Sequence, residues 1–195
     1  MKLSDLSLPS WPFDLAATLG SGQSFHWLRH AGGWLGCIGE DPVWMDQPEP
    51  GLLRCTAGME EKVRHFLALD HDMERLTATF PAADAGLAAA VQWCPGLRIL
   101  RQPRWECLAT FITSSMKQVA HIRQISLTLR QKFGVRRELP GFPPVWSYPA
   151  PEAMAATSER TASGSGCRSV LFRTTTGWAP LSHAIVRQRS IRRRL

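Results

Sequence analysis

The feature that most constrains the fold is a change in hydrophobic periodicity near Gly58. From Gly20 to Ala57, short apolar runs are separated by turn residues at intervals of about 8 to 12 residues, which is typical of an antiparallel meander of about four strands. These runs do not alternate strictly, so the sequence leaves the two faces of the sheet unassigned. We therefore expect a small antiparallel sheet to open the domain.

After Gly58 the periodicity becomes helical. Val63, Phe66 and Leu67 share one side of the stretch 59–69, and two glutamates stand in its first turn, where the helix dipole favours acidic side chains. Proline or glycine ends the next two apolar stretches. These stretches predict short helices over residues 72–80 and 83–94.

The segment Arg104–Gly134 has the most regular pattern in the chain. Apolar residues recur at helical spacing in two stripes, one formed by Trp105, Leu108, Ala109 and Ile112, the other by Val119, Ile122, Ile125 or Ser126, Leu129 and Phe133. The polar residues 113–115 separate the stripes and could cap the start of the second helix, and Gly134 is placed to cap its end. We predict two packed helices with a polar junction.

Basic residues are unevenly distributed. The formal charge of +7 and a pI near 9.7 would by themselves suggest a nucleic-acid partner. However, residues 1–159 hold 15 Lys and Arg and all 16 Asp and Glu, a charge of −1, whereas residues 160–195 hold eight Arg and no acid, a charge of +8. Three interpretations of this basic tail stay open: a nucleic-acid-binding arm, a disordered terminus, or a segment translated out of frame.

Several classes of protein are disfavoured by the sequence. The five cysteines are odd in number and never form C-x-x-C, so we expect reduced, mostly buried thiols rather than disulfides or a zinc knuckle. His26 and His30 lie four residues apart, but in a strand-like region without a nearby carboxylate or cysteine, so no metal is expected. No cofactor is expected either. There is no apolar run of about 18 residues and no signal-peptide pattern, which predicts a cytoplasmic protein without a membrane partner.

A series of short motifs then points to a family. Gly22-Gln23-Ser24-Phe25-His26-Trp27 resembles a G-Q-S-F-x-W signature that lies on an early strand, and Leu100–Leu108 resembles L-R-Q-x-x-x-E-C-L. Phe66–Asp70 and Tyr148–Glu152 continue the likeness, which ends close to Glu159. In this order, the motifs resemble the N-terminal half of 8-oxoguanine DNA glycosylases, members of the helix-hairpin-helix DNA glycosylase superfamily.

The resemblance implies an α+β fold, with an N-terminal antiparallel sheet and helices followed by the start of an α-helical helix-hairpin-helix domain that is truncated. We accordingly divide the chain into an α+β domain (1–100), a partial helix-hairpin-helix domain (101–159) and the basic tail (160–195). The implied partner is damaged double-stranded DNA, bound by a monomer in a bacterial-type cytosol or nucleoid.

The implied activity is base-excision repair. Members of the family rotate the damaged base out of the duplex, because its reactive bonds are inaccessible in the stack. They then act as DNA N-glycosylases and abasic-site lyases. A different class of function, a non-catalytic DNA-binding module or an inactive fragment, stays open for this chain.

Lesion recognition is assigned by the resemblance to Gly22, Gln23 and Phe25. The Gly22 carbonyl would accept a hydrogen bond from the N7 hydrogen that 8-oxoguanine has and guanine lacks; guanine would leave this acceptor unsatisfied, at a cost of about 1 to 3 kcal/mol. The alternative is that Gly22 only permits a strand bulge.

The resemblance places DNA contacts at the junction of the two predicted helices. The corresponding residues here are Ser115, Met116, Lys117, Gln118 and His121. The asparagines and the arginine found there in animal members are absent, although Lys117, Gln118 and His121 can still contact a phosphate or a base edge. A solvated helix start is the alternative interpretation.

No catalytic residue is carried over. The family uses a nucleophilic lysine that forms a Schiff base and an aspartate that stabilises charge, both beyond the matching region. The four lysines of this chain, Lys2, Lys62, Lys117 and Lys132, stand in other contexts. We therefore expect an inactive chain whose helices between Arg104 and Phe133 expose apolar faces.

Overall fold

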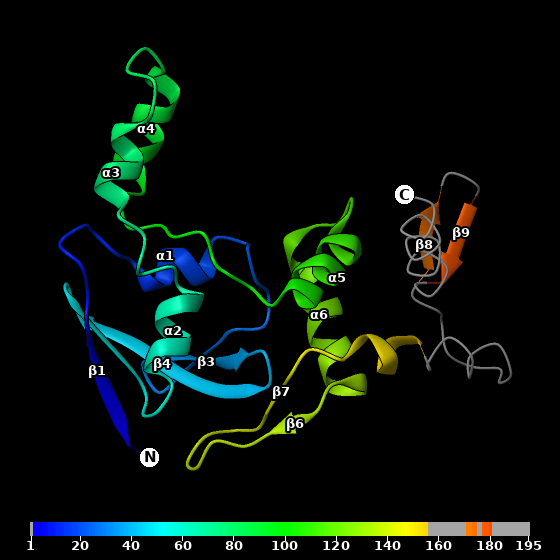
Figure 1. Cartoon of the computed structure of the whole chain (residues 1–195). Coiled ribbons are helices and arrows are strands. Elements are labelled where there is room, and N and C mark those ends of the chain that lie inside the picture. The colour runs from blue at the N-terminus through cyan, green and yellow to red at the C-terminus, as the bar shows by residue number, and fades with distance from the viewer. Residues whose placement is uncertain (1, 156–170, 175–176, 181–195) are drawn as a thin grey trace, which may run out of the picture.

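The predicted antiparallel sheet forms the N-terminal part of the molecule (Figure 1). A computed structural model describes residues 2–155, 171–174 and 177–180. Five strands pair in the order β1-β5-β4-β3-β2, all antiparallel. Their bounds are β1 Leu3–Ser7, β2 Leu28–His30, β3 Gly33–Ile38, β4 Asp41–Glu49 and β5 Leu52–Thr56. The four-strand meander is thus confirmed, with β1 added at its edge.

Strand β1 and helix α1 (Leu15–Gly20) were not predicted from the apolar pattern. The two leucines of β1 are three residues apart, which hides a strand pattern, and only Leu6 is buried, opposite Leu53. For α1 a signal was available, because the Asp14 carboxylate caps the helix by accepting a 2.8 Å hydrogen bond from the Ala17 amide. A six-residue helix is too short to reveal itself by periodicity.

The segment Gly22–Trp27, which resembles the family signature, does not lie on a strand. Residues 22–27 are irregular, and β2 begins only at Leu28, so the expectation that this signature lies on a strand is wrong. The physical reason is that the hydrogen bonds of Gln23 go to residues 98–102 rather than to a neighbouring strand of the sheet.

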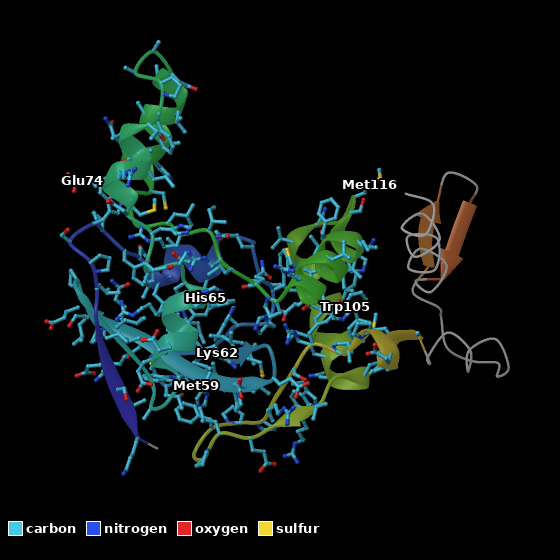
Figure 2. All side chains as sticks on the ribbon, viewed as in Figure 1. Met59, Lys62, His65, Glu74, Trp105 and Met116 are labelled. Atoms are coloured by element: carbon cyan, nitrogen blue, oxygen red, sulfur yellow. The ribbon has the colours of Figure 1, made fainter. Side chains whose placement is uncertain are left out.

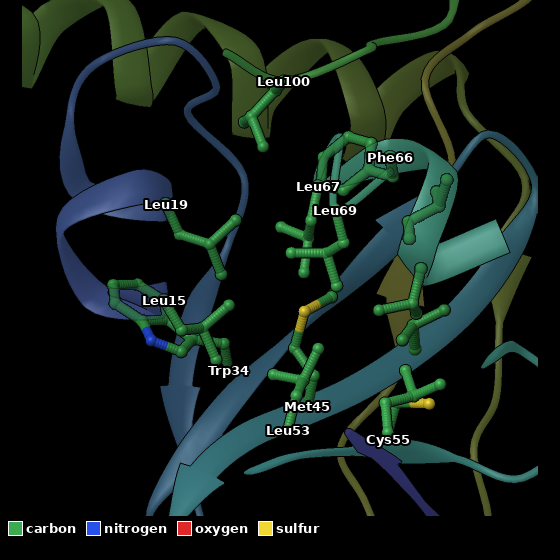
Figure 3. Close-up of a cluster of buried hydrophobic side chains, with 14 of the residues drawn as sticks. Leu15, Leu19, Trp34, Met45, Leu53, Cys55, Phe66, Leu67, Leu69 and Leu100 are labelled. Carbon is green, nitrogen blue, oxygen red and sulfur yellow. The ribbon is translucent and has the colours of Figure 1, made fainter. Parts of the chain in front are cut away.

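Strand β3, which lies between β4 and β2, explains why the alternation was imperfect. All six of its residues are buried, because both faces of the sheet are covered. Trp34 and Ile38 belong to the main apolar cluster, together with residues of α1 and α2, as Figure 3 shows for part of it. Leu35 and Cys37 point to the other face and form a smaller cluster with Trp44, Leu139 and Val145. A doubly buried strand needs no polar alternation.

The predicted helices of residues 59–94 are confirmed as α2 (Glu60–Phe66), α3 (Met73–Ala78) and α4 (Ala85–Trp93). In α2 and directly after it, Val63, Phe66 and Leu67 are buried against the sheet. By contrast, α3 and α4 contain no buried residue, and in Figure 1 they extend away from the sheet. Asp72 and Asp84 cap their starts with side-chain hydrogen bonds of 2.9 Å.

The two regular helices are confirmed as α5 (Arg104–Ser114) and α6 (Val119–Phe133). The predicted inner face of α5 is correct in part, because Ala109 is buried and Trp105 and Ile112 are half-buried. Leu108 and Phe111 are exposed, and the buried residues of α5 are Glu106, Ala109, Thr110 and Thr113. In α6, Ile122, Ser126 and Leu129 are buried as predicted, whereas Val119 is exposed. Glu106 and Thr113 of α5 lie inward because they form an ion pair and a hydrogen bond there. The exposed side chains of Leu108, Phe111 and Val119 form the apolar surface that was expected.

The caps of α6 are also partly different. Residues 113–115 do not cap its start, because the hydroxyls of Thr113 and Ser114 donate to carbonyls of α5 at 3.0 and 2.9 Å. The N-cap is Gln118, without a side-chain hydrogen bond. Gly134 is the C-cap as predicted, and its missing side chain allows close contact, since a Cβ there would lie 2.1 Å from the Ser147 carbonyl oxygen.

After α6, strands β6 (Arg136–Arg137) and β7 (Val145–Trp146) pair and pack on β3. Strands β8 (Leu171–Thr174) and β9 (Gly177–Pro180) pair with each other. The other residues of 160–195 lie outside the described part of the chain, so the interpretations of the basic tail stay predictions, as does the division at residue 100. In the described residues, no helix combines the length and the apolar character that a membrane crossing requires.

Candidate functional site

Gly22 begins the irregular loop 22–27, in the position that the sequence assigned to recognition. Its φ of +86° is a conformation that favours glycine, and a Cβ built there would meet no atom within 4 Å. The backbone of Gly22 therefore borders open space. Since the residue is not in a strand, the strand-bulge alternative does not describe it.

The other residues of the loop are more enclosed. Gln23 and Phe25 are half-buried, and Ser24 is buried with a hydroxyl that has no hydrogen-bond partner among the described residues. The side-chain amide of Gln23 is directed at the backbone of residues 98–100. The proposed contacts of Gln23 and Phe25 with a damaged base remain predictions.

The loop continues into a buried cluster that we call the ionic junction, composed of His26, Glu106 and Arg130. His26 Nε2 lies 2.8 Å from the Cys37 carbonyl oxygen, and its Nδ1 lies 3.5 Å from Glu106 Oε1. Because a carbonyl only accepts, Nε2 is the nitrogen that carries the hydrogen. Burial, together with the Arg130 charge, holds the pKa of His26 well below its usual range, so this imidazole is neutral at pH 7.

Glu106 and Arg130 form the charged pair of the ionic junction. An Arg130 Nη donates to Glu106 Oε1, and the other Nη donates to the Trp146 carbonyl at 3.0 Å. Burial raises the pKa of Glu106, and the neighbouring guanidinium opposes this shift. The pair connects α5, α6 and β7, and His26 adds the loop 22–27 to the same cluster.

A cavity of about 180 Å³ adjoins the ionic junction between the sheet, α6 and β7. His26, Cys37, Arg130 and Val145 are among its lining residues. Burial raises the pKa of Cys37 to about 12, so its thiol is not a nucleophile at neutral pH.

The four described cysteines are free; Cys37 and Cys55 are buried, Cys94 is half-buried and Cys107 is exposed.

The turn between α5 and α6 contains the residues predicted to contact DNA. Met116 is 94% exposed and has a φ of +59°, an uncommon conformation for a residue with a side chain (Figure 2). Ser115, Gln118 and His121 are exposed, and Lys117 is half-buried with its Nζ 3.4 Å from the Ser115 carbonyl oxygen. His121 lines a shallow groove of about 230 Å³ with residues of α6.

Helix α5 joins the two predicted sites. Glu106, in its first turn, contacts His26 of the loop 22–27, and Ser114, at its end, precedes the turn between α5 and α6. At 1.5 Å of rise per residue, the helix separates these points by roughly 12 Å. The loop and the turn are thus held at opposite ends of one helix rather than brought together in one pocket.

The polar residues of the ionic junction and their neighbours were not predicted from apolar periodicity. Glu106 and Thr110 on α5, and Ser126 and Arg130 on α6, recur at a spacing of four, which could have indicated two facing polar stripes. Arg98 is only 1% exposed, and its guanidinium has no hydrogen-bond partner in the described residues. No pattern in the sequence indicates that burial.

A family match and a solved structure indicate the same family. The N-terminal domain family of 8-oxoguanine DNA glycosylase matches residues 5–108, more than half of the chain. MBOgg1, solved in complex with a low affinity DNA ligand, is 25% identical, with a TM-score of 0.69 over 85% of this chain.

Two more distant structures share the fold. The 8-oxoguanine glycosylase/lyase of Clostridium acetobutylicum in its apo form is 20% identical, with a TM-score of 0.67 over 84% of this chain. The 3-methyladenine DNA glycosylase of Archaeoglobus fulgidus is 15% identical, with a TM-score of 0.60 over 79%. The chain spans 62% of MBOgg1, 61% of the Clostridium protein and 58% of the Archaeoglobus protein.

Proposed function

Because the chain belongs to the family of 8-oxoguanine DNA glycosylases, we propose that it recognises 8-oxoguanine in duplex DNA for base-excision repair. The Gly22 carbonyl is the observation that carries this proposal. It accepts no hydrogen bond from the described residues, whereas its neighbours Ser21 and Gln23 are both tied by hydrogen bonds. A carbonyl that is fixed and unbonded is suited to a donor on a ligand.

The chemistry of the two bases explains the discrimination. The N7 of 8-oxoguanine carries a hydrogen and donates to the Gly22 carbonyl, whereas the N7 of guanine presents a lone pair to the same oxygen. Once a bound base covers this carbonyl, leaving it unsatisfied costs about 1 to 3 kcal/mol, which corresponds to a preference of roughly 5- to 150-fold. The base has to leave the stack for this contact to form.

Duplex DNA is the proposed partner. The MBOgg1 structure is named as a complex with a DNA ligand, and the Clostridium protein has also been solved with double-stranded DNA that has cytosine opposite 8-oxoG. In this chain, Lys117, Gln118 and His121 would contact the DNA backbone or a base edge. Met116, which projects from the turn, would lie against the duplex.

We do not propose that the residues of this chain alone cleave the glycosidic bond. A Schiff base requires a lysine in a site that lowers its pKa, usually by burial or a neighbouring positive charge. None of the four lysines is buried; Lys62, for example, is exposed and paired with Asp41. This observation favours the second candidate function, a module that binds damaged DNA without cleaving it.

Borohydride trapping on a duplex with 8-oxoguanine opposite cytosine separates the two functions, and we expect no covalent crosslink. In a separate measurement of affinity, we expect this duplex to bind more tightly than its guanine counterpart. A crosslink would show that an amine nucleophile is present and would refute the non-catalytic candidate. Equal binding of both duplexes would refute lesion recognition itself.

A further inference from the structure

Two glutamine side chains tie the recognition loop to the segment that precedes α5. Gln23 Oε1 accepts from the Leu100 amide at 2.8 Å, and Gln23 Nε2 donates to the Arg98 carbonyl at 2.8 Å. In return, Gln102 Nε2 donates to the backbone carbonyl of Gln23 at 2.5 Å. Each glutamine thus binds the backbone of the other's segment, and we call this arrangement the glutamine clamp.

The clamp restrains the backbone directly after Gly22. The Gln23 side chain makes the same pair of hydrogen bonds to Arg98 and Leu100 that a neighbouring strand would make. Gln23 Nε2 also contacts Ser21 Oγ at 2.9 Å, so the residue before Gly22 is held as well. A glycine is otherwise free to change its backbone angles, so this restraint falls where it has most effect.

We propose that Gln23 and Gln102 are positioning residues that set the direction of the Gly22 carbonyl. This inference rests on the proposed function, and it gives Gln23 an indirect role, through Gly22, rather than a contact with the base. The polar atoms of its amide are already used within the protein. Gln102, which the sequence analysis did not single out, has the same role from the other side of the clamp.

Gln47 offers a matched control in another part of the chain. Its Oε1 accepts from the Leu15 amide at 2.8 Å, and its Nε2 donates to the Phe13 carbonyl at 2.8 Å. The chemistry and distances equal those of Gln23, but the tied segment leads into α1. Loss of Gln47 therefore reports the effect of losing such a pair of bonds when every bond of the glutamine clamp is kept.

The test compares three variants of the full chain, Gln23→Ala, Gln102→Glu and Gln47→Ala. The Gln102→Glu change keeps the size of the side chain and replaces the donor to the Gln23 carbonyl by an acceptor. For each protein, the dissociation constants are measured by fluorescence anisotropy for duplexes with 8-oxoguanine or guanine opposite cytosine. Thermal unfolding of each variant is recorded in parallel.

We expect Gln23→Ala and Gln102→Glu to lose about five-fold or more of the preference for 8-oxoguanine, with little change in guanine-duplex affinity. Gln47→Ala should keep the preference while losing as much thermal stability as Gln23→Ala. An unchanged preference in both clamp variants would overturn the inference and leave the proposed function standing. So would an equal loss in all three. No preference in the unmodified chain would overturn the proposed function, and this inference with it.

Discussion

The sheet and the α5–α6 pair differ in the side chains that they bury: the sheet buries mainly apolar groups, whereas the helix pair also buries charged ones. The sheet packs an apolar cluster of many side chains, among them Leu53, Val63 and Phe66, each almost completely buried. The helix pair meets the sheet through the ionic junction, where a single carboxylate faces a guanidinium and an imidazole. An apolar interior distributes its stability over many contacts, whereas a buried charge depends on one partner.

The largest effect should therefore come from breaking the charged pair. Arg130→Met leaves Glu106 buried without its partner, and we expect a loss of about 3 to 5 kcal/mol in the free energy of unfolding, measured with urea. Adding Glu106→Leu to this variant should recover most of the loss, because the pair is then replaced by apolar groups. A single variant within 1 kcal/mol of the wild type would contradict a buried ionic junction.

The apolar interior should respond nearly as strongly, but only where it is closed. Leu53→Ala removes a side chain that is 0% exposed, and the resulting cavity should cost about 2 to 5 kcal/mol. The matched change Leu76→Ala, on α3 at 42% exposure, should cost less than about 0.5 kcal/mol. Similar losses at both positions would show that α3 packs against another part of the protein.

A third change tests the close contact after α6. Gly134→Ala introduces a methyl group where the Ser147 carbonyl oxygen leaves no room, and we expect a loss of about 1 to 3 kcal/mol. The control is Gly86→Ala on α4, where a Cβ would approach no atom closer than 3.4 Å. If thermal unfolding ranked Gly86→Ala as the more damaging change, the described path of β7 past α6 would be wrong.

The smallest effect concerns pH. The pKa of His26 is lowered in the folded state, so the unfolded chain binds the proton first as the pH falls below about 6.5. Stability should then fall towards pH 5 by at most about 1.4 kcal/mol per pH unit. His26→Gln should reduce this slope. The raised pKa of Glu106 acts in the opposite direction in both proteins, so the difference between their urea curves is the informative quantity.

An identical pH slope in the two proteins would mean that His26 is not held neutral in the folded state. The conservative replacement matters here, because a glutamine amide can still donate to the Cys37 carbonyl. A general loss of packing would lower the stability of the variant at every pH and leave the slope unchanged.

Apolar periodicity predicted most of the helices and strands, but it did not predict features that depend on contacts between residues far apart in the sequence. The meander and the helices α2 to α6 follow from apolar spacing and turn residues. The motif around Gly22 was expected on a strand, and it lies in the loop 22–27 instead. The inner face of α5 was predicted only in part: Ala109 is buried as expected, but Glu106 and Thr110 also lie inward. The burial of the Glu106 carboxylate depends on a partner 24 residues away in α6. β3 was ambiguous because the chain that covers its second face comes from residues 139–145.

The candidate site shows the same division. Gly22 was proposed as a site residue from a local motif, and its φ of +86° is a conformation that favours glycine. The role of Gln102 could not be read locally, because its partner Gln23 lies 79 residues away. Contacts between distant segments follow from the fold, and one sequence without relatives aligned to it contains no pattern for them.

In the proposed function, the Gly22 carbonyl distinguishes 8-oxoguanine from guanine by the hydrogen on N7. Three duplexes test it most directly, with 8-oxoguanine, guanine or 8-bromoguanine opposite cytosine, because bromine adds bulk at C8 without placing a hydrogen on N7. Equilibrium competition should show a preference of roughly 5- to 150-fold for 8-oxoguanine, and similar binding of the other two. If the 8-bromoguanine duplex binds as tightly as the 8-oxoguanine duplex, recognition follows the C8 substituent and the account is wrong.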